Sequence, residues 1–223
     1  MNFGYAAAIR ADFPELVSGV VRVGGITKNG DVARLVAHFD AIAQARLATG
    51  KEGDLPEIRA WRRAFAKMGM KPTQYRCASE ALLRRFRKER ALPRLHPLVD
   101  LCNAISLAFA TPVAVFDVAK ISGGLEVRRA RGDEAYEAFS GEVERPERGE
   151  VIFADDAGRA HARRWTNRQS GYSAVRDETS AVLIVAEAMH ETAADDVRRL
   201  TAEVAKSLAD VWSVAAAIET LSR

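Results

Sequence analysis

The sequence has few residues of the kinds that build metal sites or disulfide frameworks, and it has no long apolar run. Its 223 residues include four histidines and two cysteines, and Cys77 and Cys102 lie far apart without the spacing of metal ligands. We therefore expect two reduced core thiols and no metal site. No stretch of roughly 18 uninterrupted apolar residues exists, and Asp12, Pro14 and Glu15 stand where a signal peptide would need an apolar run. These absences predict a cytoplasmic protein with no membrane partner and no cofactor.

Charge of one sign does not dominate the chain, since the formal net charge is only +3. The segment 71–94, however, carries eight basic residues against Glu80 and Glu89, which gives it a net charge of +6. Leu82, Leu83 and Phe86 would form the apolar stripe of a helix in this segment, with the basic residues on the remaining surface. A local basic surface favours a polyanion such as RNA as the partner, and an ordinary solvated helix face is the alternative.

Hydrophobic periodicity predicts helices towards both ends of the chain and strands in the middle. The predicted helices cover 31–48, a segment that starts after Pro56, the basic segment, and 98–109. The predicted strands cover 16–23, 113–118, 125–129, 151–153, 160–165 and 181–187. Because strict alternation of strand and helix is absent, we expect an α+β fold with a mixed or antiparallel central sheet and flanking helices. With 48% of its residues hydrophobic, 1–223 should form a single compact domain in which 1–75 packs on the rest.

The segment 192–222 is predicted as one long amphipathic helix. Val197, Leu200, Val204 and Leu208 begin an apolar series that continues in steps of three or four residues to Ile218. This stripe would pack along the domain. Because its spacing is nearly heptad, it would alternatively form the seam of a homo-oligomer.

A few polar residues interrupt elements that are otherwise apolar. Asn103 lies within the predicted helix 98–109, where a partly buried amide needs hydrogen-bond partners. Asp177, Glu178 and Thr179 lie at the entrance of the strand 181–187, where side chains can project into a pocket. A structural asparagine and a charged turn are the alternatives. No Ser/His/Asp or Cys/His arrangement that would mark an activated nucleophile is recognisable.

A polar and aromatic cluster begins at Trp165 and continues through Asn167, Arg168 and Gln169 to Tyr172. An aromatic ring in such a cluster can stack on a base, while the polar side chains bond phosphate, ribose or a base edge. The alternative interpretation is that Trp165 is a core residue at a sheet edge.

Four short segments occur in a recognisable order. They are Leu-Val-Asp-Leu-Cys-Asn at 98–103, Pro112 with Phe-Asp at 116–117, Ile-Ser-Gly-Gly-Leu-Glu-Val-Arg at 121–128, and Asp-Glu-Thr at 177–179. Through these segments, residues of about 76–188 resemble the B3/4 editing domain of the phenylalanyl-tRNA synthetase β subunit. This domain also occurs in freestanding proteins. The resemblance implies a tRNA-binding, editing-like protein that hydrolyses a mischarged aminoacyl-tRNA ester in trans. Nothing resembles the aminoacylation module, so no ligase activity is implied.

The resemblance, together with the local charge and side-chain patterns, assigns roles to particular residues. Asn103, Glu178 and Thr179 match catalytic pocket positions. The substrate pocket with the terminal nucleotide would include Ala114, Phe116, Trp165, Asn167, Arg168 and Gln169. The tRNA phosphates would be bound by Lys71, Arg76, Arg84, Arg85, Arg87 and Lys88.

Two departures from the family pattern change the expected chemistry. Ala114 stands where the synthetase motif has a histidine, and 165–171 replaces a glycine-rich stretch. Ester cleavage would then use a positioned water and the terminal ribose hydroxyl, with Glu178 orienting the water or recognising the substrate's amino group. His96 and His161 are candidate replacements for the histidine. The alternative function is a non-catalytic RNA-binding or small-molecule-sensing module that keeps the pocket scaffold.

Overall fold

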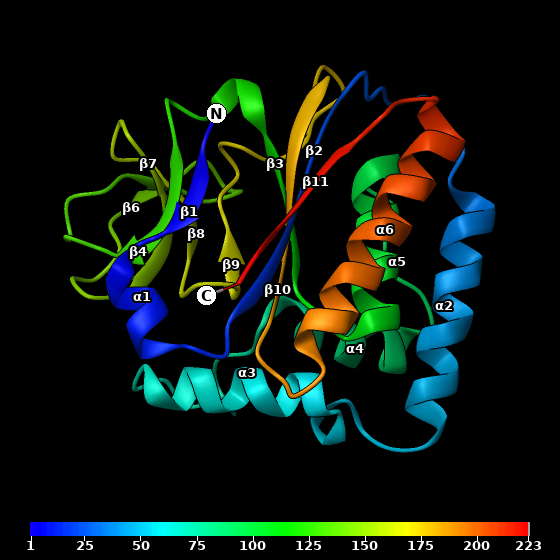
Figure 1. Ribbon diagram of the computed structural model, residues 1–223, viewed down its shortest axis with the longest axis horizontal. Coiled ribbons are helices and arrows are strands. Elements are labelled where there is room, and N and C mark those ends of the chain that lie inside the picture. The colour runs from blue at the N-terminus through cyan, green and yellow to red at the C-terminus, as the bar shows by residue number, and fades with distance from the viewer. Residues whose placement is uncertain (223) are drawn as a thin grey trace.

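The computed structural model describes residues 1–222 and has three layers: a five-stranded sheet, a four-stranded sheet and a layer of helices (Figure 1). The helices are α1 (Ala7–Asp12), α2 (Ala33–Ala48), α3 (Pro56–Lys67), α4 (Ala78–Glu89), α5 (Pro97–Phe109) and α6 (Ala193–Trp212). The short 3₁₀ helices are η1 (Glu52–Asp54) and η2 (Val118–Lys120). No helix within the described residues is long and apolar enough to cross a membrane.

The four-stranded sheet lies in the middle layer and is antiparallel. Its strand order is β11 (Ala217–Leu221), β2 (Val17–Gly24), β10 (Ala181–Ala188) and β3 (Val113–Asp117). One face packs against α2, α5 and α6, through a core that includes Val21, Leu101, Ile105, Val115, Ile184 and Val204. β3 is an edge strand of this sheet, so one of its backbone edges is left for contacts outside the ladder.

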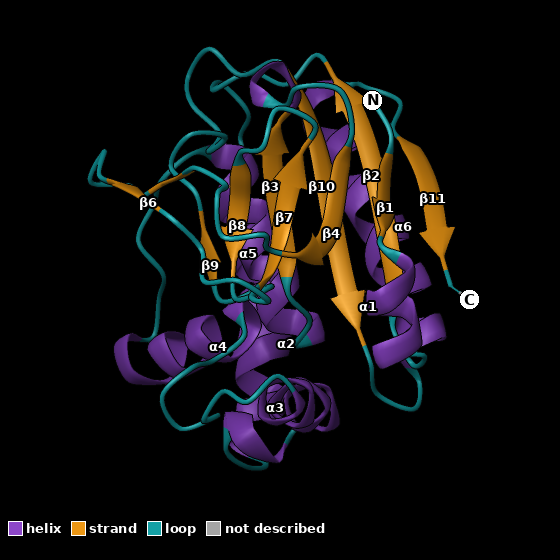
Figure 2. Cartoon of the chain, turned by 90° about the vertical axis from the view of Figure 1, so that its left-hand side faces the viewer, coloured by secondary structure: helices purple, strands orange, loops and turns teal. Residues whose placement is uncertain are grey.

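The five-stranded sheet covers the other face of the middle sheet. Its strand order is β1 (Phe3–Tyr5), β4 (Leu125–Arg129), β7 (Val151–Asp155), β8 (Ala160–Arg163) and β9 (Arg168–Gln169), and only the β1–β4 pair is parallel. β5 (Tyr136–Glu137) and β6 (Val143–Glu144) form a separate ribbon, and β6 projects away from the sheets (Figure 2). The core between the sheets includes Val20, Phe116, Phe153, Trp165, Leu183 and Val185.

The α+β prediction is confirmed, and the mixed and antiparallel strands are divided between two sheets. The predicted helices and the longer strands are present at nearly the predicted positions. The amino-terminal strands are integral parts of both sheets, because β1 pairs with β4 and β2 pairs with β10 and β11.

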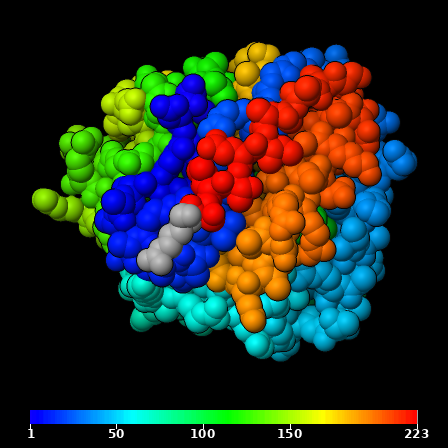
Figure 3. All heavy atoms as spheres, in the orientation of Figure 1, coloured from blue at the N-terminus to red at the C-terminus, as the bar shows by residue number. Residues whose placement is uncertain are grey.

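The carboxyl-terminal helix is shorter than the predicted 192–222. α6 ends at Trp212, Ser213 has a left-handed backbone with φ of 54°, and β11 then adds to the edge of β2. Figure 3 shows this last segment lying across the surface between the amino-terminal part of the chain and α6. The prediction of one apolar stripe through Ile218 is therefore wrong beyond Trp212, and the stripe from Val197 to Leu208 packs within the chain.

Candidate functional site

A cavity of about 560 Å³ opens beside the edge strand β3, between α5 and the loop that precedes β10. Its apolar lining includes Val99, Cys102, Val113, Val115 and Val175, and its polar lining includes His96, Asn103, Gln169, Asp177 and Glu178. A volume of this size is within the range of small-molecule sites. Because it also brings together Asn103 and Glu178, this cavity, hereafter the large cavity, is the candidate functional site.

Asn103 reaches the cavity from α5. Leu98, Leu101 and Ile105 are completely buried on that helix, which fixes its rotation and leaves Asn103 half-buried at the cavity wall. Within residues 1–222 the Asn103 amide makes no hydrogen bond. Its donors and acceptor are therefore available to a ligand.

Glu178 reaches the cavity from the loop before β10. Thr179 anchors this loop, because its hydroxyl donates to Asp117 Oδ2 at 2.8 Å and accepts from the backbone N–H of Arg176 at 2.9 Å. Thr179 is buried and does not line the cavity, which corrects its predicted place beside the substrate. Asp177, next to Glu178, forms an exposed ion pair with Lys28 at 3.0 Å. The structure therefore brings Asn103 and Glu178 together and gives Thr179 a supporting position.

Cys102 is a buried thiol at the cavity wall. Burial raises the pKa of Cys102 to about 12 and that of Cys77 to about 12 as well. Both thiols are therefore protonated at neutral pH and neither is an activated nucleophile.

The polar side chains of Asn167, Arg168 and Gln169 form hydrogen bonds to other parts of the protein. Asn167 Nδ2 donates to the backbone oxygen of Arg76 at 2.7 Å, and Arg168 forms two hydrogen bonds to Glu144 at 2.7 and 3.0 Å. Gln169 Nε2 donates to the backbone oxygen of Val115 at 2.7 Å and so joins β9 to the free edge of β3. Of these predicted substrate-binding residues, only Gln169 lines the large cavity.

A second, much smaller cavity of about 60 Å³ lies between the two sheets. Ala114, Trp165, Asn167, Arg168 and Gln169 line it together with Glu187. Trp165 is completely buried, and its Nε1 donates to Glu187 Oε1 at 2.8 Å. The ring has no exposed face, so the prediction that Trp165 stacks on a nucleotide is wrong and the core interpretation holds. Phe116 is also fully buried between the sheets.

The predicted substrate pocket is thus divided by the alternation of side chains along β3. Val113 and Val115 face the helices and the large cavity, whereas Ala114 and Phe116 face the five-stranded sheet. Position 114 therefore lies in the small cavity, away from Asn103 and Glu178. A volume of about 60 Å³ is far below that of usual ligand sites.

An exposed aromatic ring stands at the rim of the large cavity. Phe139, in the turn between β5 and β6, is 66% exposed, and the guanidinium of Arg176 lies 5.9 Å from its ring centroid. Leu95 at the same rim is 69% exposed. Neither residue could be predicted as part of the site from the sequence, because a lone apolar residue in a turn or loop carries no periodic signal.

The basic residues of 71–94 lie on and near α4, but several are paired. Glu52 is buried and lies 3.0 Å from Arg87 and 3.8 Å from Arg84. Arg85 pairs with Glu89 at 2.8 Å, and Arg76 lies 3.5 Å from the buried Glu80. Lys71 and Lys88 are exposed and form no ion pair with any residue among 1–222. The segment 91–96 leads from the end of α4 to the cavity, which it lines with Leu95 and His96.

His161, the other candidate for the missing histidine, is in the core. It is completely buried, with Nδ1 2.8 Å from Ser173 Oγ and Nε2 3.2 Å from Asp155 Oδ2. It lines neither cavity. His161 therefore has a structural position.

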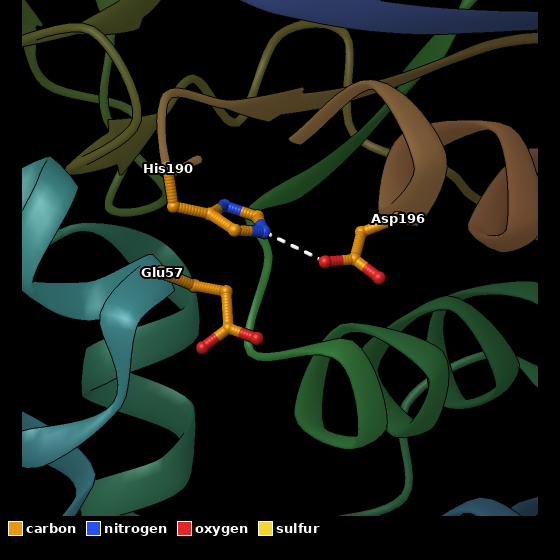
Figure 4. A group of neighbouring side chains, drawn as sticks. All are labelled: Glu57, His190 and Asp196. Carbon is orange, nitrogen blue, oxygen red and sulfur yellow. Dashed lines mark hydrogen bonds and ion pairs between the residues drawn. The ribbon is translucent and has the colours of Figure 1, made fainter. Parts of the chain in front are cut away.

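Glu57, His190 and Asp196 form a buried group whose spacing would suit a metal ion (Figure 4). His190 Nε2 lies 2.8 Å from Asp196 Oδ2. Arg46 donates to Glu57 at 2.7 Å, and Arg199 pairs with Asp196. Because the two arginines supply the positive charge that a metal would supply, we interpret this group as two neighbouring ion-pair clusters, one between α2 and α3 and one at the start of α6.

Parts of the chain are similar in sequence to phenylalanine–tRNA ligase β subunits. The phenylalanine–tRNA ligase β subunit of Cereibacter sphaeroides is 40% identical over 60 residues, which are 27% of this chain and 8% of that protein. The β subunit of Haemophilus influenzae is 25% identical over 142 residues, or 64% of this chain and 17% of that protein. The chain thus spans less than a fifth of the length of either relative.

The fold has a counterpart among solved structures. An N-terminal fragment of the phenylalanyl-tRNA synthetase β subunit from Pyrococcus horikoshii matches 96% of this chain and 50% of that chain, with a TM-score of 0.51 and 10% sequence identity. The model of the B3/4 domain family matches residues 60–208, which is more than half of the chain. The chain therefore belongs to the B3/4 domain family.

Proposed function

We propose that this protein binds the aminoacylated 3′ end of a tRNA in the large cavity and hydrolyses the aminoacyl ester in trans. The proposal is supported chiefly by one observation: Asn103 and Glu178, from two segments that resemble the editing domain, line the same cavity, and their side chains make no hydrogen bond to any residue among 1–222. Their amide and carboxylate groups are suited to an ester, an α-ammonium group and a water molecule.

The lining of the cavity suggests how the substrate would be held. The valines and Cys102 suit an uncharged amino-acid side chain, while Glu178 would bind the α-ammonium group or orient the attacking water. Phe139 with Arg176 at the rim would stack on the terminal base, in place of the buried Trp165. Lys71 and Lys88 would contact the phosphates, since their charges are not balanced by ion pairs among residues 1–222.

The test is deacylation of a panel of mischarged tRNAs. We expect turnover of at least one of them by the wild type and a loss on the order of 10²-fold in Glu178→Ala, the usual range for a lost acid–base or orienting group. Glu126→Ala is the matched control, because Glu126 is an exposed carboxylate on β4 that does not line the cavity. Absence of turnover on every tRNA, with binding intact, would remove the enzymatic part of the proposal.

A non-catalytic RNA-binding module is the second candidate, and the small cavity favours it. Position 114, where the synthetase motif has a histidine, faces a space of about 60 Å³ that is bounded by Trp165 and Glu187. An aminoacyl group does not fit in that space, so hydrolysis by the family's arrangement is not expected here. Salt-dependent tRNA binding without hydrolysis would support this second function.

A further inference from the structure

His96 occupies the N-cap of α5 in an unusual way, with its ring in place of the usual short side chain. Its Nδ1 accepts a hydrogen bond from the backbone N–H of Leu98 at 3.2 Å. A ring nitrogen that accepts a hydrogen bond carries no proton, so the proton of the neutral imidazole is on Nε2. Burial lowers the pKa of His96, against the opposing effects of Asp177 and Asp100, which favours this neutral form.

The proton on Nε2 has no acceptor within residues 1–222. His96 is only 6% exposed, and its Nε2 is shielded from water and makes no hydrogen bond to any residue among 1–222. A buried donor without a partner costs free energy, and such a donor in a native structure calls for an explanation. His96 lines the large cavity, and its Nδ1 edge is bound to the backbone of α5, so Nε2–H is the donor of the ring that has no partner among residues 1–222. Because Nε2 is shielded in the free protein, a ligand would reach it only when the side chains that cover it move aside.

We propose that His96 is a hydrogen-bond donor to the ligand of this cavity and that its Nε2–H donates to the carbonyl oxygen of the bound aminoacyl ester. This inference rests on the proposed function. As the oxygen of water bonds to the carbonyl carbon, the carbonyl oxygen gains negative charge that the donor stabilises. The bond from the carbonyl carbon to the ribose oxygen then breaks, and a proton from the water goes to that ribose oxygen. His96 keeps its proton throughout.

The same geometry excludes His96 as the general base. Nε2 already carries a proton, and Nδ1 is occupied by the N–H of Leu98. His96 therefore replaces the histidine that is absent at position 114 with a different role and from a different element.

Two substitutions of His96 separate the proposed role of Nε2 as a donor from the role of Nδ1 as the cap of α5. Asn in His96→Asn can accept from the N–H of Leu98 but has no group in the place of Nε2, whereas Gln in His96→Gln carries an amide N–H near that place but makes a poorer cap. We expect His96→Asn to keep the wild-type unfolding midpoint and to lose on the order of 10²-fold in kcat with little change in KM. His96→Gln should show the opposite: a lower unfolding midpoint and a smaller loss of kcat. Wild-type kcat in His96→Asn would overturn the inference.

Nitrogen-15 NMR of the histidine ring provides a readout that does not depend on turnover. We expect the proton of His96 on Nε2 in the free protein and a shift of that resonance when a non-hydrolysable amide-linked aminoacyl-adenosine binds. A proton on Nδ1, or binding of this analogue without a shift at Nε2, would overturn the role of His96 even if the wild type is active. If the wild type hydrolyses no tRNA but the Nε2 resonance shifts, the hydrolytic proposal fails while the donor role stands, and failure of the analogue to bind overturns both.

Discussion

Glu187 is a carboxyl group buried between the two sheets, where it accepts hydrogen bonds from two aromatic side chains. Tyr5 Oη donates to Glu187 Oε1 at 2.7 Å, and Trp165 Nε1 donates to the same oxygen at 2.8 Å. Burial raises the pKa of Glu187 from 4.5 to about 7 in spite of these two hydrogen bonds, which favour the charged form. The folded protein therefore holds the Glu187 proton more tightly than the unfolded chain does.

This difference makes the free energy of unfolding depend on pH. The wild type should lose stability as pH rises from about 4.5 to about 7, because the unfolded chain releases the Glu187 proton first. The loss attributable to this group is about 3 kcal/mol, from roughly 1.4 kcal/mol for each pKa unit. Glu187→Gln, which stays neutral, should not show this loss. Urea unfolding of both proteins at pH 5 and pH 8 measures the effect, and an equal change with pH in both would contradict it.

At the level of single residues, the sequence indicated which side chains could take part in binding, but not which way each of them points. Asn103 and Glu178 both line the large cavity. Thr179, Phe116 and Trp165 are turned into the interior, because their burial is decided by sheets that form between distant segments. Local sequence indicated that Trp165 was at a strand end, but the side it faces depends on the turn after β8, where φ of Trp165 is 58° and its N–H donates to the backbone oxygen of Val151 at 2.7 Å.

At the level of elements, α4 combines structural and free basic residues. Arg87 lies 3.0 Å from Glu52, which is only 3% exposed, so Arg87 neutralises a buried carboxylate. Lys88, its neighbour, is exposed and forms no ion pair with residues 1–222. These adjacent cations should therefore contribute to different properties of the protein.

Substitution of the two cations separates these properties. Lys88→Gln should leave the free energy of unfolding unchanged and should reduce the slope of log Kobs for tRNA against log salt concentration by about 0.9, the value for one lost phosphate contact. Arg87→Gln should destabilise the fold by about 1 kcal/mol, because Glu52 loses its nearest partner. Filter binding over a salt series and urea unfolding measure the two effects. A salt slope in Lys88→Gln equal to that of the wild type would contradict the role of α4 in tRNA binding.

The carboxyl-terminal element shows where periodicity fails as a predictor. Residues beyond Trp212 continue the spacing of α6, so the pattern alone predicts one helix. The free edge of β2 offers backbone hydrogen bonds that a longer helix would leave unmade, and residues 217–221 form β11 along it. Close packing helps to place α6 on β2, because a Cβ at Gly19 would lie 2.3 Å from Thr201 Cγ2.

At the level of the whole molecule, the layers place the candidate site at the edge of the middle sheet. β3 forms the boundary between the large cavity on the helix side and the small cavity between the sheets, and Gln169 lines both. The α+β class could be predicted from periodicity and from the family resemblance. The division of the strands into two sheets could not, because it depends on β1, β9 and β11, which have two to five residues each.

The large cavity is proposed to hold the aminoacyl end of a tRNA. A crystal structure of the protein with an amide-linked aminoacyl-adenosine would locate that end. We expect the aminoacyl group in the cavity, within hydrogen-bond distance of Asn103 and Glu178, and the adenine against Phe139. An analogue bound only elsewhere, such as in the groove lined by Arg46, Arg198 and Arg199, or a cavity that stays free of it at saturating concentration, would contradict the claim.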